Sequence, residues 1–322
     1  IFPFRVANSN STQNTRSEAT GDWDVERCAS NKDHAAWGMG GIVVSTATDS
    51  ATLKIWAWKP DSSNYRGKEV RLFYNMQVES YTPTWAGTAE PISTHIDSTL
   101  GCIVHTFEQD VDTLHWQFVK TDSLQIGIEV QGCQLLSQEH GITYNEIGVN
   151  GASTASYLRC EQMEKQLPGI KPDLVIFGIG INDAHVPQDD FSSVAFTNRY
   201  DSLIARIRTS NPEVRFLFLT NNDSYYKKRY PNQNASAVRN CMYSLADKHG
   251  AAVWDLFEIM GGLGSIKSWE DAGLAKSDYI HLTRQGYYLQ AELLFQAFMQ
   301  SYGDHLQKKH GMLQTTKPTI PN

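Results

Sequence analysis

The chain has 322 residues, 41% of them apolar, which is enough for two ordinary domains with their own cores. A formal net charge of −7 argues against a nucleic acid or an anionic membrane surface held by bulk charge. No apolar stretch approaches the roughly 20 residues needed to cross a bilayer, so we expect no membrane span.

The five cysteines are widely spaced, with no CxxC and no zinc-like pairing with histidine, so a structural metal is not expected. Cys102 and Cys133 both lie in strand-like segments and could pair. An odd count leaves at least one thiol free.

The first part of the chain predicts strands. Residues 1–36 are polar and irregular, which is typical of a loop. From 37 to 140, apolar and polar residues alternate with period two, for example over 53–57, 70–74, 114–118 and 124–130. Such strands at short intervals, separated by turns, predict an antiparallel β-sandwich.

After about residue 141 the pattern alternates between strand and helix. We expect strands at 144–149, 174–177, 214–220 and 251–256, and helices at 153–166, 196–208, 235–249 and from Arg284 onward. Strands separated by helices indicate a parallel sheet in an α/β domain. The segment from Lys308 is expected to be a loose tail.

The motif with most chemical content is Asp278-Tyr279-Ile280-His281, at a loop-to-helix junction. A carboxylate three residues before a histidine can orient the imidazole and stabilise its charge, as in a nucleophile-His-acid triad. The structural alternatives are a helix N-terminal acid for Asp278 and a histidine without a catalytic task for His281.

Two further motifs could stabilise an oxyanion. Asn182 of Gly180-Ile181-Asn182-Asp183 follows the apolar run 174–177 and could aim its amide at a developing negative charge. Gly151 opens a predicted helix and could offer its backbone N–H. A turn residue and close helix packing are the respective alternatives.

These blocks resemble those of the SGNH (GDSL-like) hydrolase superfamily, whose members carry a Gly-Asp-Ser nucleophile, an oxyanion Gly, a Gly-x-Asn-Asp and a C-terminal Asp-x-x-His. The chain matches the last three at Gly151, Gly180 to Asp183 and Asp278 to His281, over about residues 141–302. The stretch from Trp269 to Tyr287 is similar to the branch of bacterial peptidoglycan O-acetylesterases and related carbohydrate esterases, which have a β-sandwich inserted after the nucleophile block.

The resemblance implies an SGNH/flavodoxin-like three-layer α/β domain with an inserted antiparallel β-sandwich. Residues 1–36 would belong to the hydrolase domain, 37–140 to an accessory domain that could bind carbohydrate, 141–307 to the hydrolase domain and 308–322 to the tail. The implied activity is removal of acetyl or another small acyl group from peptidoglycan or another polysaccharide, without a cofactor, in the periplasm or outside the cell.

The nucleophile is the departure from the family pattern, because Gly-Asp-Ser does not occur in these 322 residues. Ser123, in Asp122-Ser123, comes nearest to the Gly-Asp-Ser nucleophile block. However, residues 124–130 alternate as a strand where the family has a helix, so Thr121-Asp122-Ser123 is better explained as a hairpin turn.

The position of the missing serine follows from the resemblance. The branch places its nucleophile block before a Phe-Pro-Phe-Arg-like segment, and this chain opens with Ile1-Phe2-Pro3-Phe4-Arg5. We therefore expect the serine in a segment preceding Ile1, on a strand central to the sheet. Loss of that strand would leave two rows of backbone groups unpaired, and an intact sheet built from residues 1–322 would overturn the expectation.

Three residues are candidates for substrate contact: His185 beyond the oxyanion block, Asn222 beyond a predicted strand, and Trp85 in a loop, where an aromatic ring could stack on a sugar. A loop histidine, turn chemistry and core packing are the alternatives. Two other functions stay open, a catalytically inactive glycan-binding protein and a lipid or aryl esterase.

Overall fold

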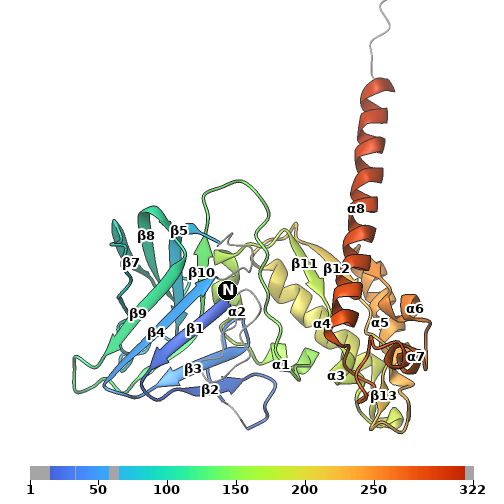
Figure 1. Cartoon of the computed structure of the whole chain (residues 1–322), viewed down its shortest axis with the longest axis horizontal. Coiled ribbons are helices and arrows are strands. Elements are labelled where there is room, and N and C mark those ends of the chain that lie inside the picture. Colours follow the sequence, from blue (N-terminus) through green and yellow to red (C-terminus); the bar gives the residue numbers. More distant parts are fainter. Residues whose placement is uncertain (1–14, 33, 58–64, 316–322) are drawn as a thin grey trace, which may run out of the picture. The chain divides into compact units, whose positions relative to one another are not determined.

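A computed structural model describes residues 15–32, 34–57 and 65–315 (Figure 1). Two compact units make up the chain. One holds the described residues up to Val175 together with Asn198–Arg215, and the other holds Ile176–Thr197 and the residues from Phe216 onward. The opening Ile1-Phe2-Pro3-Phe4-Arg5 lies outside the described residues, and the domain limits predicted at 36, 140 and 307 stay predictions.

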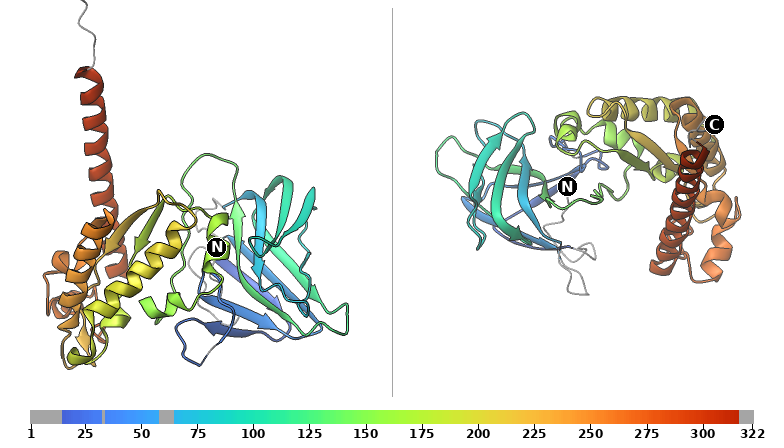
Figure 2. Two further views of the ribbon diagram at one scale, coloured as in Figure 1. Left: turned by 180° about the vertical axis from the view of Figure 1, so that it is seen from behind. Right: turned by 90° about the horizontal axis from the view of Figure 1, so that it is seen from above.

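The first unit contains two antiparallel sheets that lie one behind the other (Figures 1 and 2). One sheet has the order β1 (Thr15–Thr20), β4 (Ser50–Ala57), β9 (Thr113–Val119), β6 (Thr84–Trp85). The other has the order β2 (Asp24–Arg27), β3 (Ile42–Thr46), β10 (Ile128–Leu136), β5 (Gly67–Tyr74), β8 (Cys102–Val111), β7 (Ser93–Asp97).

The core between these sheets follows the predicted alternation. Leu53 of β4 pairs with Trp116 of β9, and both are fully buried, whereas the side chain of Lys54, the next residue of β4, is 40% exposed. Leu72 of β5 and Val130 of β10 enter the same apolar cluster from the second sheet. The predicted β-sandwich is therefore present.

A buried histidine lies in this core. His105 of β8 is 1% exposed and accepts a hydrogen bond at Nε2 from Trp116 Nε1 (3.2 Å). Its Nδ1 lies 2.9 Å from Thr94 Oγ1. Because Nε2 is the acceptor, the proton of the neutral ring is on Nδ1, which donates to the Thr94 hydroxyl.

Residues 15–27 were predicted as loop, and that prediction is wrong for β1 and β2. β1 pairs with β4 from Thr15↔Ala57 to Thr20↔Thr52. As an edge strand with no fully buried residue, it needs no apolar alternation, so its Thr-Arg-Ser-Glu-Ala-Thr sequence carries no strand signal.

The α/β part is built on a three-stranded sheet in the order β11 (Leu174–Phe177), β12 (Arg215–Leu219), β15 (Ala252–Trp254). β12 and β15 are parallel. The helices between and after these strands are α3 (Ile181–Ala184), α4 (Ser193–Arg208), α5 (Asn234–His249), α6 (Leu256–Met260), α7 (Ile266–Asp271) and α8 (Arg284–Thr315), with a small hairpin of β13 (Tyr225–Tyr226) and β14 (Tyr230–Pro231). The strands predicted at 174–177, 214–220 and 251–256 and the helices predicted at 196–208, 235–249 and from Arg284 are confirmed.

Alternate residues of β12 face opposite sides of this sheet. Leu217 and Leu219 join an apolar cluster that Leu293 and Leu294 of α8 cover. Phe216 and Phe218 lie on the other side, where their rings stack on Phe177 at 5.6 and 5.5 Å. Both faces of the strand are thus apolar, as expected for a sheet between helices.

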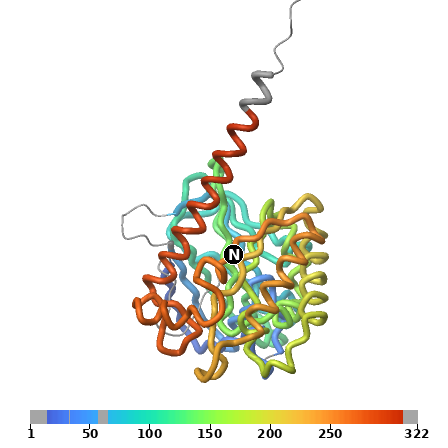
Figure 3. Tube along the Cα trace, turned by 90° about the vertical axis from the view of Figure 1, so that its right-hand side faces the viewer, coloured from blue at the N-terminus to red at the C-terminus, as the bar shows by residue number. Residues whose placement is uncertain are grey.

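Helix α8 continues beyond the other elements of its own unit (Figures 1 and 3). It passes Lys308, where a loose tail was predicted to begin, and ends at Thr315. No helix in the described part of the chain combines the length and apolar character needed to cross a membrane.

The strand predicted at 144–149 does not form, and that prediction is wrong. Ile142 and Tyr144 are 100% and 79% exposed, and the segment is assigned neither strand nor helix. A strand exists only with a hydrogen-bonding partner, and none of the described residues pairs with this segment.

The helix predicted at 153–166 is interrupted. It consists of α1 (Thr154–Leu158), α2 (Met163–Gln166) and a final 3₁₀ turn at Leu167–Gly169. Tertiary hydrogen bonds replace helical ones at the break. Arg206 donates to the carbonyls of Leu158 (3.0 Å) and Cys160 (3.4 Å), and the Gln162 amide donates to the Trp37 carbonyl (3.1 Å).

The β11 strand forms an edge of the sheet as far as the described residues extend. Its apolar residues Leu174 and Ile176 are 39% and 42% exposed. An apolar strand with a free edge is unusual, because such an edge offers unpaired backbone groups to any other strand. The intact sheet that would have overturned the expected missing strand is not found among the described residues.

Candidate functional site

The loop before α8 brings the Asp278 and His281 side chains together. Asp278 Oδ2 lies 2.9 Å from His281 Nδ1. Asp278 Oδ1 accepts hydrogen bonds from the backbone N–H groups of Ile280 and His281, both at 2.9 Å. The carboxylate therefore shapes the loop with one oxygen and orients the imidazole with the other.

The backbone of this loop is held in an uncommon conformation. Tyr279 has φ +56°, in the left-handed region that non-glycine residues rarely adopt. Two hydrogen bonds fix it to the segment after β12: the Tyr225 N–H donates to the Tyr279 carbonyl (2.8 Å) and Asn222 Nδ2 donates to the Ile280 carbonyl (2.8 Å). The turn is thus preset by contacts outside the motif.

The charge of Asp278 is stabilised in this position. Partial burial opposes ionisation, but the hydrogen bonds from the His281 amide and imidazole and the Ile280 amide outweigh it and hold the pKa of Asp278 below its usual value. The side chains of His281 and Asp278 are 52% and 32% exposed. With Nδ1 directed at an ionised carboxylate, Nε2 is the nitrogen of a half-exposed ring that is left for proton transfer.

The Gly180-Ile181-Asn182-Asp183 turn carries the predicted oxyanion donor. Gly180 has φ +140°, and a Cβ there would lie 3.1 Å from Asn221 Nδ2 and 3.2 Å from Val238, so both conformation and space require glycine. Asn182 is exposed in α3.

The end of α3 is fixed by two buried amides that the sequence analysis missed. Asn232 and Asn234 both donate to the Ala184 carbonyl at 3.0 Å, and Asn234 also donates to the Val186 carbonyl at 3.0 Å. The only available signal was the density of asparagine after the predicted strand at 214–220.

His185 lies next in the chain, with its ring 5.1 Å from that of Tyr226. Burial, and to a lesser extent the charge of Lys227, lowers the pKa of its imidazole. Its Nδ1 is buried and has no hydrogen-bond partner among the described residues. A substrate contact for His185 stays a prediction.

Asn222 has a structural task. Its Nδ2 donates to the carbonyls of Asp223 and Ile280, both at 2.8 Å, so both amide protons serve the protein itself. Asn222 therefore positions the Asp278–His281 loop, and this geometry favours the alternative of turn chemistry over substrate contact.

A partly buried carboxylate at the end of β15, Asp255, was also missed. It accepts from Thr220 Oγ1 (2.8 Å), Tyr243 Oη (2.9 Å) and Arg239 Nε (2.7 Å). These bonds tie the ends of β12 and β15 to α5. Among the described residues, no three His, Cys, Asp or Glu side chains converge as a metal site.

The remaining predicted residues belong to the first unit. Gly151 has φ +80°, in the turn that closes with the Ala152 N–H bound to the Val149 carbonyl (3.0 Å). The Ser153–Ser156 capping box then starts α1. The placement of Gly151 opposite Asn182 and His281 stays a prediction.

Ser123 lies in an exposed turn between β9 and β10. Asp122 Oδ1 accepts from the Leu124 N–H (2.8 Å), and β10 begins only at Ile128. The turn leads from one sheet to the other, because β9 pairs with β4 and β6 whereas β10 pairs with β3 and β5. The predicted hairpin is therefore wrong, although the segment is a turn as expected and not a strand-to-helix junction.

Trp85 packs toward the sandwich core. Its ring lies 4.9 Å from Phe107 and 5.2 Å from His105, and its Nε1 donates to the Ala89 carbonyl (2.7 Å). This environment fits the core-packing alternative for Trp85.

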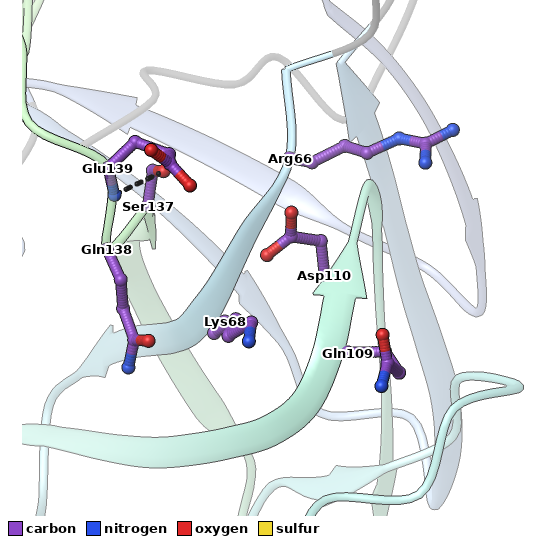
Figure 4. A pocket seen from close by; sticks show the side chains of 7 residues that line it. All are labelled: Arg66, Lys68, Gln109, Asp110, Ser137, Gln138 and Glu139. Carbon is purple, nitrogen blue, oxygen red and sulfur yellow. Dashed lines mark hydrogen bonds between the residues drawn. The ribbon is translucent and has the colours of Figure 1, made fainter.

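One surface hollow of about 430 Å³ lies in the first unit, on β5, β8 and the segment after β10 (Figure 4). It is lined by charged and amide side chains: Arg66, Lys68, Gln109, Asp110, Ser137, Gln138 and Glu139. None of the predicted site residues lines it.

Comparisons with known proteins bear on the family and the fold. Residues 131–289 match the model of the GDSL-like lipase/acylhydrolase family. The fold is similar to a solved structure of a peptidoglycan O-acetylesterase, with a TM-score of 0.71 and 18% identity over 93% of this chain and 81% of that one. No curated protein sequence matches the chain.

Two shorter likenesses are to a lipase/acylhydrolase from Enterococcus faecalis (TM-score 0.36, 21% identity, 46% of this chain and 70% of that one) and to an acetyl xylan esterase (TM-score 0.36, 21% identity, 47% and 78%). The family match and the fold shared with the first structure confirm the predicted resemblance and the predicted fold class.

Proposed function

We propose that this protein is a serine esterase that removes acetyl or another small acyl group from a carbohydrate, and the match of residues 131–289 to the GDSL-like lipase/acylhydrolase family model supports this proposal. The observation that carries the proposal is the contact of 2.9 Å between His281 Nδ1 and an ionised Asp278. This pair can accept a proton from a serine at Nε2 and return it to the leaving alcohol.

In this mechanism the serine oxygen attacks the ester carbonyl while His281 takes the serine proton. Asp278 keeps the proton on Nδ1 and stabilises the imidazolium that forms. Asn182 and the Gly151 N–H donate hydrogen bonds to the oxyanion. His281 then protonates the alcohol, and a water attacks the acyl-enzyme by the same route.

The nucleophile is assigned to a segment outside these 322 residues, on a strand that pairs with β11. Two observations support this assignment: the apolar edge of β11 is exposed at Leu174 and Ile176, and the predicted strand 144–149 lacks a partner among the described residues. A strand between them would satisfy both rows of backbone groups.

We propose the substrate class from the similarity in fold. The structure named as a peptidoglycan O-acetylesterase makes O-acetylated peptidoglycan the first substrate to test, and the cell envelope the corresponding location. Acetylated xylan is the comparison substrate, with acetate release as the measurement.

The experiment that tests the proposal is labelling with a fluorophosphonate, which reacts with activated serines, followed by peptide mapping. We expect the label on a serine in a Gly-Asp-Ser sequence outside the 322 residues. We also expect p-nitrophenyl acetate turnover to fall by about 10⁴-fold in His281→Ala.

The matched control is His305→Ala, an exposed histidine on α8, which should keep full turnover. A label on Ser123 would overturn the assignment of the nucleophile and leave the esterase in place. Neither label nor turnover in the full-length protein would contradict the esterase and favour the inactive glycan-binding alternative.

A further inference from the structure

Two buried cysteines face each other in the first unit. Cys28 follows β2 and Cys160 lies between α1 and α2, and both are 0% exposed. A Cβ added at Gly41 would lie 2.7 Å from Cys28 Sγ and 3.7 Å from Cys160 Sγ. Both sulphurs thus border the same small space beside Gly41, and the two thiols lie close enough to perturb each other's pKa.

The backbone around both cysteines is fixed in this arrangement. Arg159 donates to the carbonyls of Cys28 (3.0 Å) and Ser30 (2.8 Å), and its guanidinium lies 4.6 Å from the centre of the Trp37 ring. The Cys28 N–H donates to the Gly41 carbonyl (2.8 Å). These contacts hold the segment after β2 beside the segment between α1 and α2.

The two thiols differ in acidity. The hydrogen bond with Cys160 outweighs burial and, together with the Arg159 guanidinium, lowers the pKa of the Cys28 thiol, while the pKa of Cys160 is raised. Cys28 is therefore the thiol that reaches the reactive thiolate form more readily.

We propose that Cys28 and Cys160 form a disulfide that ties the β2–β3 connection to the segment carrying Gly151. The oxidant is a small-molecule disulfide. The Cys28 thiolate attacks one of its sulphurs and releases the first thiol; Cys160 then attacks Cys28 Sγ and releases the second. Two cysteine thiols are oxidised and one disulfide is reduced. Because both sulphurs are buried, the exchange takes place during folding or when this connection opens.

The other cysteines do not offer such a pair. Cys102 and Cys133, which the sequence allowed to pair, lie on β8 and β10 on opposite sides of β5. Two strand spacings separate them by about 10 Å, beyond the reach of a disulfide. Cys241 lies on α5, where its Sγ contacts the Ser193 carbonyl.

The bond would act on the turn that carries Gly151. A Cβ at Gly151 would lie 3.9 Å from Ala29, the residue next to Cys28, and Val149 lies against Gly41. A Cys28–Cys160 disulfide would therefore hold this turn against the β2–β3 connection. The inference concerns the first unit alone and does not depend on the proposed esterase activity.

The test is to fold the protein with reduced or oxidised glutathione, alkylate it under denaturing conditions and map its peptides without reduction. With oxidised glutathione we expect a cross-linked Cys28–Cys160 peptide pair and three alkylated cysteines among the five. The midpoint of thermal unfolding should rise by about 5–10 °C relative to the reduced protein.

Cys28→Ser and Cys160→Ser should each abolish the cross-link and the rise, whereas the matched buried control Cys102→Ser should keep both. Five alkylated cysteines after oxidative folding, or a cross-link between another pair, would overturn the proposal. Peptide mapping of the wild-type protein shows whether Cys28 and Cys160 are cross-linked, even where a serine variant does not fold.

Discussion

Asp278 has two tasks in the candidate site, and the two carboxylate oxygens divide them. Oδ1 accepts hydrogen bonds from the backbone N–H groups of Ile280 and His281 and so maintains the loop, while Oδ2 lies within hydrogen-bond distance of His281 Nδ1. The charge matters for the second task more than for the first, since a neutral amide oxygen can also accept backbone hydrogen bonds.

Asp278→Asn is therefore expected to keep the fold and lose the chemistry. The amide oxygen can replace Oδ1, but the NH₂ group then faces His281 Nδ1 and favours the tautomer with the proton on Nε2, which cannot act as a base. We expect kcat for p-nitrophenyl acetate to fall by about 10⁴-fold with an unchanged far-ultraviolet circular dichroism spectrum.

The exposed Asp271→Asn at the end of α7 serves as the control and should retain wild-type kcat. A kcat within tenfold of the wild type in Asp278→Asn would remove Asp278 from the mechanism.

Sequence spacing predicted the Asp278–His281 pair because the contact is local, between residues three apart. It did not predict the contact from Asn222 to Ile280, which exists only because the segment after β12 lies beside the loop in space. Positioning residues of this kind depend on tertiary structure, and no local pattern marks them.

At the scale of elements, the alternation of apolar and polar residues predicted the strands that have one buried and one exposed face. It did not predict a strand whose two faces are both polar. β1 is an edge strand without a buried residue, so its polar sequence shows no strand pattern. Residues 144–149 have strand composition and form none, because composition supplies the strand tendency and only a partner supplies the hydrogen bonds.

The position of His105 in the sandwich gives a pH dependence. Burial lowers its pKa from 6.5 to about 4. Below pH 6.5 the His105 imidazole becomes protonated in the unfolded chain but stays neutral in the folded protein. The free energy of unfolding therefore falls as the pH drops toward 4. The loss reaches about 3 kcal/mol and does not grow further below pH 4.

Urea unfolding at pH 7, 5.5 and 4.5 measures this effect. We expect the fall in the free energy of unfolding to be smaller in His105→Gln than in the wild type. His95→Gln, on the exposed strand β7, should follow the wild type. Equal pH dependence in His105→Gln and the wild type would contradict the assignment.

At the scale of the whole molecule, the sequence predicted an α/β sheet and a β-sandwich, and both are present. It could not fix how the sheet ends, because strand order depends on pairings between distant segments. The described sheet ends at β11, whose apolar side chains are partly exposed.

Hydrogen exchange can test whether another strand belongs at this edge. In the 322-residue chain we expect the amides of 142–149 and those of β11 that face the open edge to exchange rapidly. The amides of β12, which has a strand on each side, should exchange about 100-fold more slowly or slower still.

In a protein that also carries the nucleophile segment, residues 142–149 and 174–177 should become protected together, while β12 stays unchanged. Protection of β11 already complete in the 322-residue chain would mean that its edge is covered by other means.

The double task of Asp278 also has an evolutionary consequence. A descendant that lost catalysis would still be selected to keep an acceptor oxygen at position 278, from aspartate or asparagine, because the loop before α8 depends on it for its shape. His281 would no longer be under selection. Among relatives of this protein, Asp or Asn at position 278 therefore reports on the architecture of the loop, and His281 together with an acidic Asp278 is the better marker of a lineage that still turns over substrate.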